Sequence, residues 1–196
     1  MENYMKKVLL IGDSIRRGYC NYVKDVLKDE AEVYFDDENC RFAAYILRYL
    51  HGWCKSLGLS DDVDLVHWNA GLWDVLEMFY DEPFTTPDYY RNVIVRITKR
   101  IKMLFPKAKI VFALTTAVDE SQCKPDFMRR NSVIKQYNEI AIEALSPLGV
   151  SFNDLYSLTE NCPPECRSDG VHFNNDCGVK FTGDAVVDCI RRELSL

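Results

Sequence analysis

Apolar runs rich in β-branched residues alternate with amphipathic helical patterns along the chain. Each run is bounded by turn-forming or charged residues, as expected of short strands that are buried on both faces. This pattern predicts strands at residues 8–11, 31–35, 63–68, 109–114 and 150–152. Apolar residues at helical spacing predict helices at residues 15–27, 41–57, 88–104, 128–145 and 179–194.

The alternation of strands and helices predicts a parallel sheet covered by helices on both faces. Five strands in a chain of 196 residues correspond to a three-layer α/β/α fold. We expect the flavodoxin-like strand order 2-1-3-4-5, in which ligands bind beyond the carboxyl ends of strands one and three. The sequence contains no linker, repeat or low-complexity segment, so we expect a single domain over residues 1–196.

Charge and cysteine content narrow the class of protein. The net charge is −6 and no run of Lys or Arg exceeds two residues, which argues against nucleic acid or an anionic membrane as a partner. The apolar run within residues 1–12 is too short for a signal peptide or a membrane span, so we expect a cytoplasmic protein.

Most of the eight cysteines of a cytoplasmic protein should be reduced thiols. The spacing of Cys162, Cys166 and Cys177 favours ordinary thiols over a zinc site.

Gly12-Asp13-Ser14 follows the first predicted strand, at the edge of the sheet where a ligand is expected. One interpretation is that Asp13 or Ser14 caps the next helix. A second is a phosphate-binding loop, although neither glycine-rich nucleotide pattern is present. In the third, Ser14 is a nucleophile, which requires a base, an acid that orients the base, and donors for an oxyanion.

A base for Ser14 has to be sought among only three histidines. His51 falls within a predicted helix, and His67 lies inside the third predicted strand, where a structural role is expected. His172 lies in a loop before the last helix, three residues after Asp169 and with a glycine between them. Asp169 could therefore bond Nδ1 of His172 and leave Nε2 to face a hydroxyl. This spacing alone is weak, but together with the strand-end serine it predicts a triad of Ser14, His172 and Asp169.

The motifs at the two ends of the chain resemble those of the SGNH/GDSL hydrolase family. Gly12-Asp13-Ser14 matches the first block of that family, and Asp-Gly-Val-His at residues 169–172 matches its last block. Asn-Asp-Leu-Tyr at residues 153–156 and an amphipathic C-terminal helix extend the resemblance over nearly the whole chain. The G-x-S-x-G elbow of α/β-hydrolases is absent. The resemblance implies a serine esterase that needs neither a metal ion nor a cofactor.

The segments expected to supply the oxyanion hole depart from the family pattern. The third block is usually G-x-N-D, but residues 71–74 read Gly-Leu-Trp-Asp and place Trp73 where the asparagine should be. Asn69, two residues before Gly71, is the preferred oxyanion donor over Trp73 or backbone groups alone. Gly71 and Asp13 are further candidates for the oxyanion or substrate-binding site. No glycine marks the second block, where Asn39 could either supply a donor or cap the next helix.

Charged and aromatic side chains also flank the predicted crevice. Arg16 and Arg17 follow Ser14, and we expect a solvated helix face there rather than contacts with an anionic substrate. An aromatic-rich stretch could wall the substrate site or simply pack within the protein; it comprises Trp73, Phe79, Tyr80 and Phe84.

The resemblance implies hydrolysis of a carboxylic ester through an acyl-enzyme on Ser14. We expect a small-molecule substrate carrying a small O-acyl group, particularly acetyl on carbohydrate, whereas lysophospholipids and acyl-thioesters stay open as substrates. The alternatives are a flavodoxin-like module that binds a phosphate-bearing ligand and a hydrolase scaffold that has lost its activity.

Overall fold

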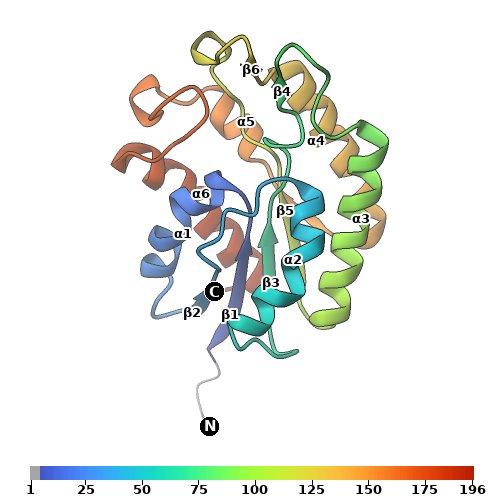
Figure 1. Cartoon of the computed structure of the whole chain (residues 1–196). Helices are drawn as coiled ribbons and strands as arrows, with labels where there is room; N and C mark the ends of the chain where they lie inside the picture. The colour runs from blue at the N-terminus through green and yellow to red at the C-terminus, as the bar shows by residue number, and fades with distance from the viewer. Residues whose placement is uncertain (1–4) are drawn as a thin grey trace.

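The computed structural model describes residues 5–196, in which a five-stranded parallel sheet lies between two layers of helices (Figure 1). The first four residues of the opening segment lie outside the described part. The strands are β1 (Lys6–Ile11), β2 (Ala31–Tyr34), β3 (Leu65–Trp68), β5 (Lys109–Ala113) and β7 (Ser151–Asn153). Their order, β2-β1-β3-β5-β7, is the predicted order of five consecutive strands. The predicted α/β/α fold is therefore confirmed.

The central strands end level with one another. Ile11 of β1 lies beside Trp68 of β3, which in turn lies beside Phe112 of β5. The loop after β3 is joined to β1 by a hydrogen bond from the Asn69 N–H to the Ile11 carbonyl, at 3.0 Å. The segments that follow β1 and β3 therefore meet at one edge of the sheet, as strand order 2-1-3 requires.

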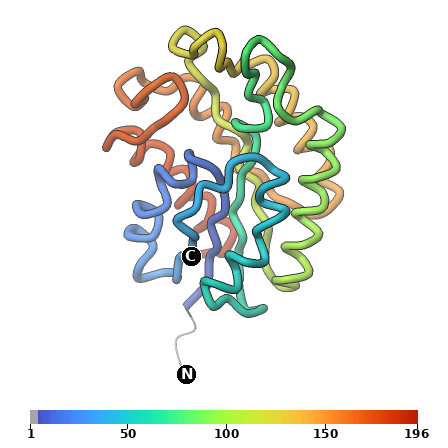
Figure 2. Tube along the Cα trace, in the orientation of Figure 1, coloured from blue at the N-terminus to red at the C-terminus, as the bar shows by residue number. Residues whose placement is uncertain are grey.

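Helices divide between the two faces of the sheet (Figure 1). On one face α1 (Ser14–Val26) packs against α6 (Asp176–Leu194), with the short α5 (Leu155–Glu160) beside α6. On the other face α3 (Pro87–Leu104) packs between α2 (Ala43–Ser56) and α4 (Asn131–Leu145). Figure 2 shows the first and last helices side by side although they are far apart in sequence. The segment before α6 is thereby brought close to the beginning of α1.

Burial follows the predicted pattern in the strands. Val8, Leu9 and Leu10 are at most 1% exposed, and every residue of β3 is buried. Burial on both faces explains why these strands appear in the sequence as continuous apolar runs. No helix within residues 5–196 is long and apolar enough to cross a membrane.

Two short strands were missed by the sequence analysis. β4 (Glu77–Met78) and β6 (Phe127–Met128) form a separate antiparallel sheet above the carboxyl edge of the main sheet (Figure 1). Strands of two residues are too short to show any periodicity. Because β6 takes up the beginning of the helix predicted over 128–145, α4 begins only at Asn131. The last helix begins earlier than predicted, at Asp176, because the Asn175 side chain caps it by accepting from the Gly178 N–H.

Candidate active site

Ser14 is the first residue of α1, just beyond the carboxyl end of β1. Asp13 is the N-cap residue, since its side chain accepts a hydrogen bond of 3.0 Å from the Ile15 N–H. The capping role therefore belongs to Asp13 and leaves the Ser14 hydroxyl free for other contacts. Ser14 Oγ lies 2.9 Å from Nε2 of His172.

The loop before α6 holds His172 against Asp169. His172 Nδ1 lies 2.8 Å from Oδ2 of Asp169, while Oδ1 of Asp169 accepts hydrogen bonds of 2.7 Å from the N–H groups of Val171 and His172. Partial burial acts to raise the pKa of Asp169, but the hydrogen bonds from His172 and the backbone outweigh it and lower this pKa. The carboxylate therefore stays ionised, so that it keeps a proton on Nδ1 and directs the lone pair of Nε2 to Ser14.

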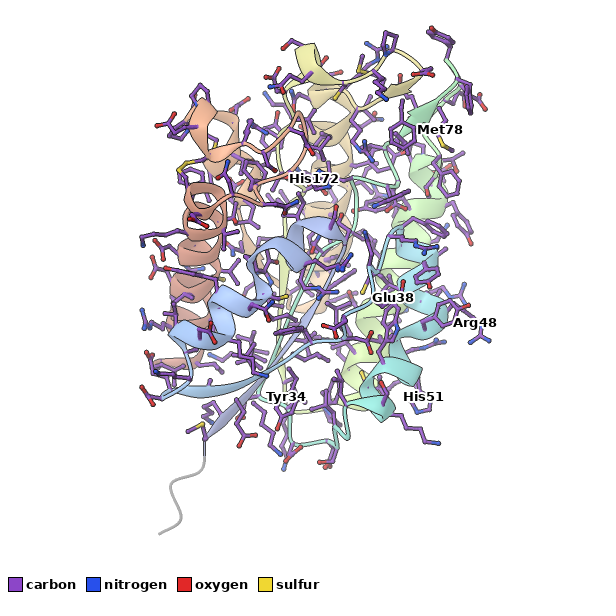
Figure 3. The ribbon with its side chains drawn as sticks, turned by 60° about the vertical axis from the view of Figure 1, so that its left-hand side comes forward. Tyr34, Glu38, Arg48, His51, Met78 and His172 are labelled. Carbon is purple, nitrogen blue, oxygen red and sulfur yellow. A yellow bond between two sulfur atoms is a disulfide. The ribbon has the colours of Figure 1, made fainter. Side chains whose placement is uncertain are left out.

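The other two histidines lie away from Ser14. His67 is fully buried in β3, and burial lowers its pKa to about 4. Its Nε2 lies 3.2 Å from the side-chain nitrogen of Asn153, which makes it a neutral structural residue. His51 lies on α2, at the far end of that helix from His172 (Figure 3). Of the three histidines, His172 alone contacts Ser14.

A cavity of about 470 Å³ opens beside Ser14 and His172. Trp73 and Phe79 line it from the segment after β3, so two members of the aromatic stretch wall the cavity. Tyr80 is 81% exposed, and Phe84 packs against Phe42 with the ring centroids 5.0 Å apart. The remaining lining comes from residues 122–129 and from the loop that carries Asp169 and His172.

Asn69 is not among the residues that line this cavity. Its side chain is buried, and its Nδ2 donates a hydrogen bond of 3.0 Å to Oδ1 of Asp13. A Cβ on Gly12 would lie 1.8 Å from the Asn69 side-chain oxygen, so the glycine before Asp13 leaves room for this amide. Asn69 thus supports the buried Asp13 carboxylate. Burial raises the pKa of Asp13, and this hydrogen bond partly opposes that rise. This bond uses one of the two N–H groups of the amide, so the role of Asn69 as the preferred oxyanion donor stays a prediction.

Replacing Asn69 by alanine should mainly lower stability. The variant loses a donor to a buried carboxylate, which typically costs about 1–3 kcal/mol in the free energy of unfolding. Urea denaturation measures this loss, and Asn92→Ala, on the exposed face of α3, serves as the control. A fall of about 10²-fold in kcat with unchanged stability would instead support Asn69 as an oxyanion donor.

The remaining candidates for the oxyanion hole lie in different surroundings. Asn39 does not cap α2: its side chain accepts from the Arg41 N–H, in a turn two residues before the helix begins. Gly71 has φ of 158°, and a Cβ there would lie 2.0 Å from the Thr115 hydroxyl, so close packing requires this glycine. Neither residue lines the cavity, whereas Trp73 does.

Asp74, the last residue of the altered third block, has a structural role. Its buried carboxylate accepts from the Ala43 N–H at the first turn of α2, with oxygen–nitrogen distances of 3.2 and 3.1 Å. Burial raises its pKa to about 7, although hydrogen bonds to Thr85 and Ala43 oppose the shift. Asp74 therefore anchors the segment that carries Trp73.

Arg16 is not on a solvated helix face, contrary to the prediction. It is 1% exposed, and its guanidinium donates to the carbonyls of Gly12, Asp36 and Glu38. The side chain therefore ties the loop after β2 to the nucleophile loop. Arg17 is exposed, as predicted.

Arg129 is a residue of the cavity that the sequence analysis missed. It lies between β6 and α4, is 6% exposed and lines the cavity together with Ser14 and His172. The neighbouring Arg130 is exposed and paired with Glu77. Because the sequence shows only two adjacent arginines, nothing in it distinguishes the buried one.

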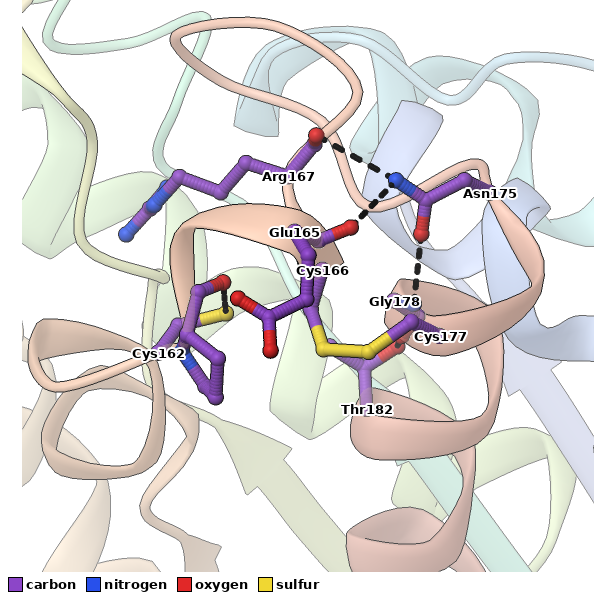
Figure 4. The surroundings of a disulfide bond; sticks show 9 residues. Cys162, Glu165, Cys166, Arg167, Asn175, Cys177, Gly178 and Thr182 are labelled. Atoms are coloured by element: carbon purple, nitrogen blue, oxygen red, sulfur yellow. Dashed lines mark hydrogen bonds between the residues drawn. A yellow bond between two sulfur atoms is a disulfide. The ribbon is translucent and has the colours of Figure 1, made fainter.

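A disulfide between Cys166 and Cys177 closes the loop that contains Asp169 and His172 (Figure 4). The expectation of reduced thiols therefore does not apply to this pair. The side chain of Asn175 donates to the carbonyls of Glu165 and Arg167, which fixes the same loop from within. Disulfides persist mainly in oxidising compartments, so this bond weighs against the cytoplasmic location, which stays a prediction.

Comparisons with known proteins find similarity at the level of structure. No family model matches the chain, and no curated protein matches it. A lipase/acylhydrolase from Enterococcus faecalis has a TM-score of 0.75 and 20% identity, with 96% of each chain covered. An acetylxylan esterase from Geobacillus stearothermophilus has a TM-score of 0.71 and 18% identity, over 100% of this chain and 97% of the esterase. A GDSL-like lipase from Bacteroides thetaiotaomicron has a TM-score of 0.71 and 18% identity, over 95% of this chain and 88% of the lipase. This chain therefore has the fold of the GDSL-type lipases and acylhydrolases, as its sequence motifs implied.

Proposed function

We propose that the protein is a serine hydrolase that cleaves carboxylic esters through an acyl-enzyme on Ser14. The observation that carries this proposal is the unbroken chain of contacts from Ser14 Oγ through the His172 ring to Asp169, with distances of 2.9 and 2.8 Å. This chain of contacts provides the nucleophile, the base and the orienting acid that acyl transfer requires.

In the proposed reaction, Ser14 Oγ attacks the ester carbonyl while Nε2 of His172 takes the hydroxyl proton. The tetrahedral intermediate collapses, the C–O bond to the alcohol breaks, and His172 gives its proton to the departing alcohol. Water then attacks the acyl-enzyme with His172 again as the base, which releases the carboxylic acid and restores Ser14. Asp169 holds the imidazole and stabilises its protonated form.

The backbone at the beginning of α1 supports the developing oxyanion. Ser14 is the first residue of this helix, and the N–H of a first residue has no acceptor within the helix. The positive end of the helix dipole lies at the same point. With Asn69 bonded to Asp13, we assign the first oxyanion donor to the Ser14 N–H, and Trp73 in the cavity wall is the candidate for a second.

Small acyl groups on carbohydrate are the proposed substrate class. The cavity is small and partly aromatic, and aromatic rings offer flat surfaces on which sugars can stack. Two of the structurally similar proteins are acetylxylan esterases. Nothing in the described part of the chain favours a phosphate-binding module. The loop after β1 presents Ser14 to His172 and contains a single glycine.

Labelling with a fluorophosphonate tests the proposal, because such a probe reacts only with an activated serine. Mass spectrometry should locate the adduct on Ser14, and the labelled protein should no longer hydrolyse p-nitrophenyl acetate. Release of acetate from acetylated xylo-oligosaccharides, compared with hydrolysis of p-nitrophenyl octanoate, then tests the substrate class. A protein that neither turns over the acetate ester nor takes up the label is not a serine hydrolase.

A further inference from the structure

The cavity beside Ser14 contains a buried cation without a counter-ion. Arg129 is 94% buried, yet within residues 5–196 it forms no ion pair with any carboxylate. Burying a guanidinium is costly unless its charge and its N–H groups are satisfied. An anionic ligand in this cavity would supply the counter-charge and the hydrogen-bond acceptors that the Arg129 guanidinium lacks.

The backbone fixes Arg129 at one nitrogen only. Its Nε donates a hydrogen bond of 2.6 Å to the Leu72 carbonyl, and the Phe127 ring lies beside the guanidinium, with its centroid 5.3 Å from Cζ. In the described part of the chain, the two terminal nitrogens have no hydrogen-bond partner, and neither is sealed from solvent. The planar fork that binds carboxylates and phosphates is therefore held in place and left open.

Nearby acids do not neutralise this cation. Asp169 is engaged by His172, and Asp13 accepts from the Ile15 N–H and from Asn69. Burial lowers the pKa of Arg129, but the charges of Asp13 and Asp169 act in the opposite direction, and an arginine stays protonated throughout.

Apart from Asp169, which is bonded to His172, the exposed rim of the cavity carries one charge of each sign. Lys124 and Asp126 both line it and are exposed, so water and salt screen their charges. The charge of the buried Arg129 is screened far less, so it makes the inner cavity favour negatively charged groups. A substrate group that reaches it should be an anion.

We propose that Arg129 is the binding site for an anionic group of the substrate, with a carboxylate as the fitting partner. This inference rests on the proposed function: a small acyl group such as acetyl carries no charge, so the carboxylate must belong to the alcohol part of the ester. The substrate class is then an O-acyl ester of a hydroxy acid, such as an acidic sugar, rather than of a neutral sugar.

A matched pair of esters tests the proposal through a ratio of activities. The carboxylate substrate is 4-acetoxybenzoate, and 4-acetoxybenzamide is its neutral isostere. The wild-type kcat/KM should favour the acid by about tenfold or more, as a charge-assisted pair predicts. Arg129→Gln should bring this ratio to within about threefold, and Arg129→Lys, which keeps the charge without the fork, should retain part of it.

The neighbouring arginine provides the control. Arg130→Gln removes an exposed guanidinium that is paired with Glu77 outside the cavity, so the preference for the acid should persist. If Arg129 acts only in folding or on the oxyanion, Arg129→Gln will lower both activities equally and leave the ratio unchanged, which overturns the proposal. A preference for 4-acetoxyphenyl phosphate over the carboxylate would overturn the assignment to a carboxylate.

Binding without turnover separates this inference from the hydrolase proposal. Calorimetry with the Ser14→Ala protein should give a Kd for 4-hydroxybenzoate at least about tenfold below that for 4-hydroxybenzamide. The added change Arg129→Gln should abolish the difference. Anion binding by a protein without esterase activity would uphold Arg129 and refute the hydrolase, whereas esterase activity without a preference for the anion would do the reverse.

Discussion

Ser14→Ala is expected to lower kcat for p-nitrophenyl acetate by at least about 10³-fold, because the variant has no group to carry the acyl intermediate. The change should leave the fold intact, since Asp13 and not Ser14 caps α1. The free energy of unfolding should therefore stay within about 0.5 kcal/mol of the wild type. Steady-state kinetics and urea denaturation of the same preparation measure both quantities.

The control for this change is Ser146→Ala. The Ser146 hydroxyl is exposed and donates to the Ile142 carbonyl, and Ser146 is not among the residues that line the cavity. Its loss should not alter turnover. Activity that survives Ser14→Ala undiminished would exclude Ser14 as the nucleophile and leave no role for its contact with His172.

His172→Ala should produce a loss of similar size, about 10³-fold or more in kcat, because Ser14 is then without a base. Fluorophosphonate labelling of Ser14 should slow in parallel, since the probe also requires an activated hydroxyl. His51→Ala is the control, because this exposed histidine lies on α2 away from the site (Figure 3).

The double variant Ser14→Ala/His172→Ala gives a sharper test. Residues that act as one unit are far from additive, so the double variant should be about as slow as either single variant. Losses that multiply would show instead that the two residues act independently. In that case the 2.9 Å contact between Oγ and Nε2 would have no catalytic meaning.

The elements of the sheet were predictable because each is specified by local periodicity. The runs at residues 8–11 and 63–68 are apolar throughout, and the structure buries them as β1 and β3. The ends of elements were less predictable. α2 begins two residues later than expected, and α4 begins after a two-residue strand whose partner lies about fifty residues earlier in the chain.

The proposed triad could be anticipated for a similar reason. Asp169 and His172 are three residues apart, so a single turn brings the carboxylate to the ring. Ser14 stands at a strand end that the topology places beside the loop before α6. The hydrogen bond across 158 residues follows from strand order and from the packing of α1 on α6.

Polar residues outside these motifs were assigned less well. Asn69 and Arg16 look like surface or site residues in the sequence, but both are buried and hydrogen-bonded within the protein. Arg129 and Arg130 are adjacent and of the same type, yet only Arg129 enters the cavity. Composition cannot distinguish a buried polar residue from an exposed one, because burial of a polar side chain depends on hydrogen-bond partners supplied by distant segments.

The sequence by itself therefore determined the order of strands and helices, the strand-end position of Ser14 and the pairing of Asp169 with His172. These features depend on contacts between near neighbours in the chain, which leave a periodic or short-range signal. Only the tertiary structure decided that Asn69 holds Asp13 and that Arg129 faces the cavity with its terminal nitrogens unpaired. The physical reason is that a side chain acquires its dielectric surroundings and its partners from segments that sequence spacing does not relate to it.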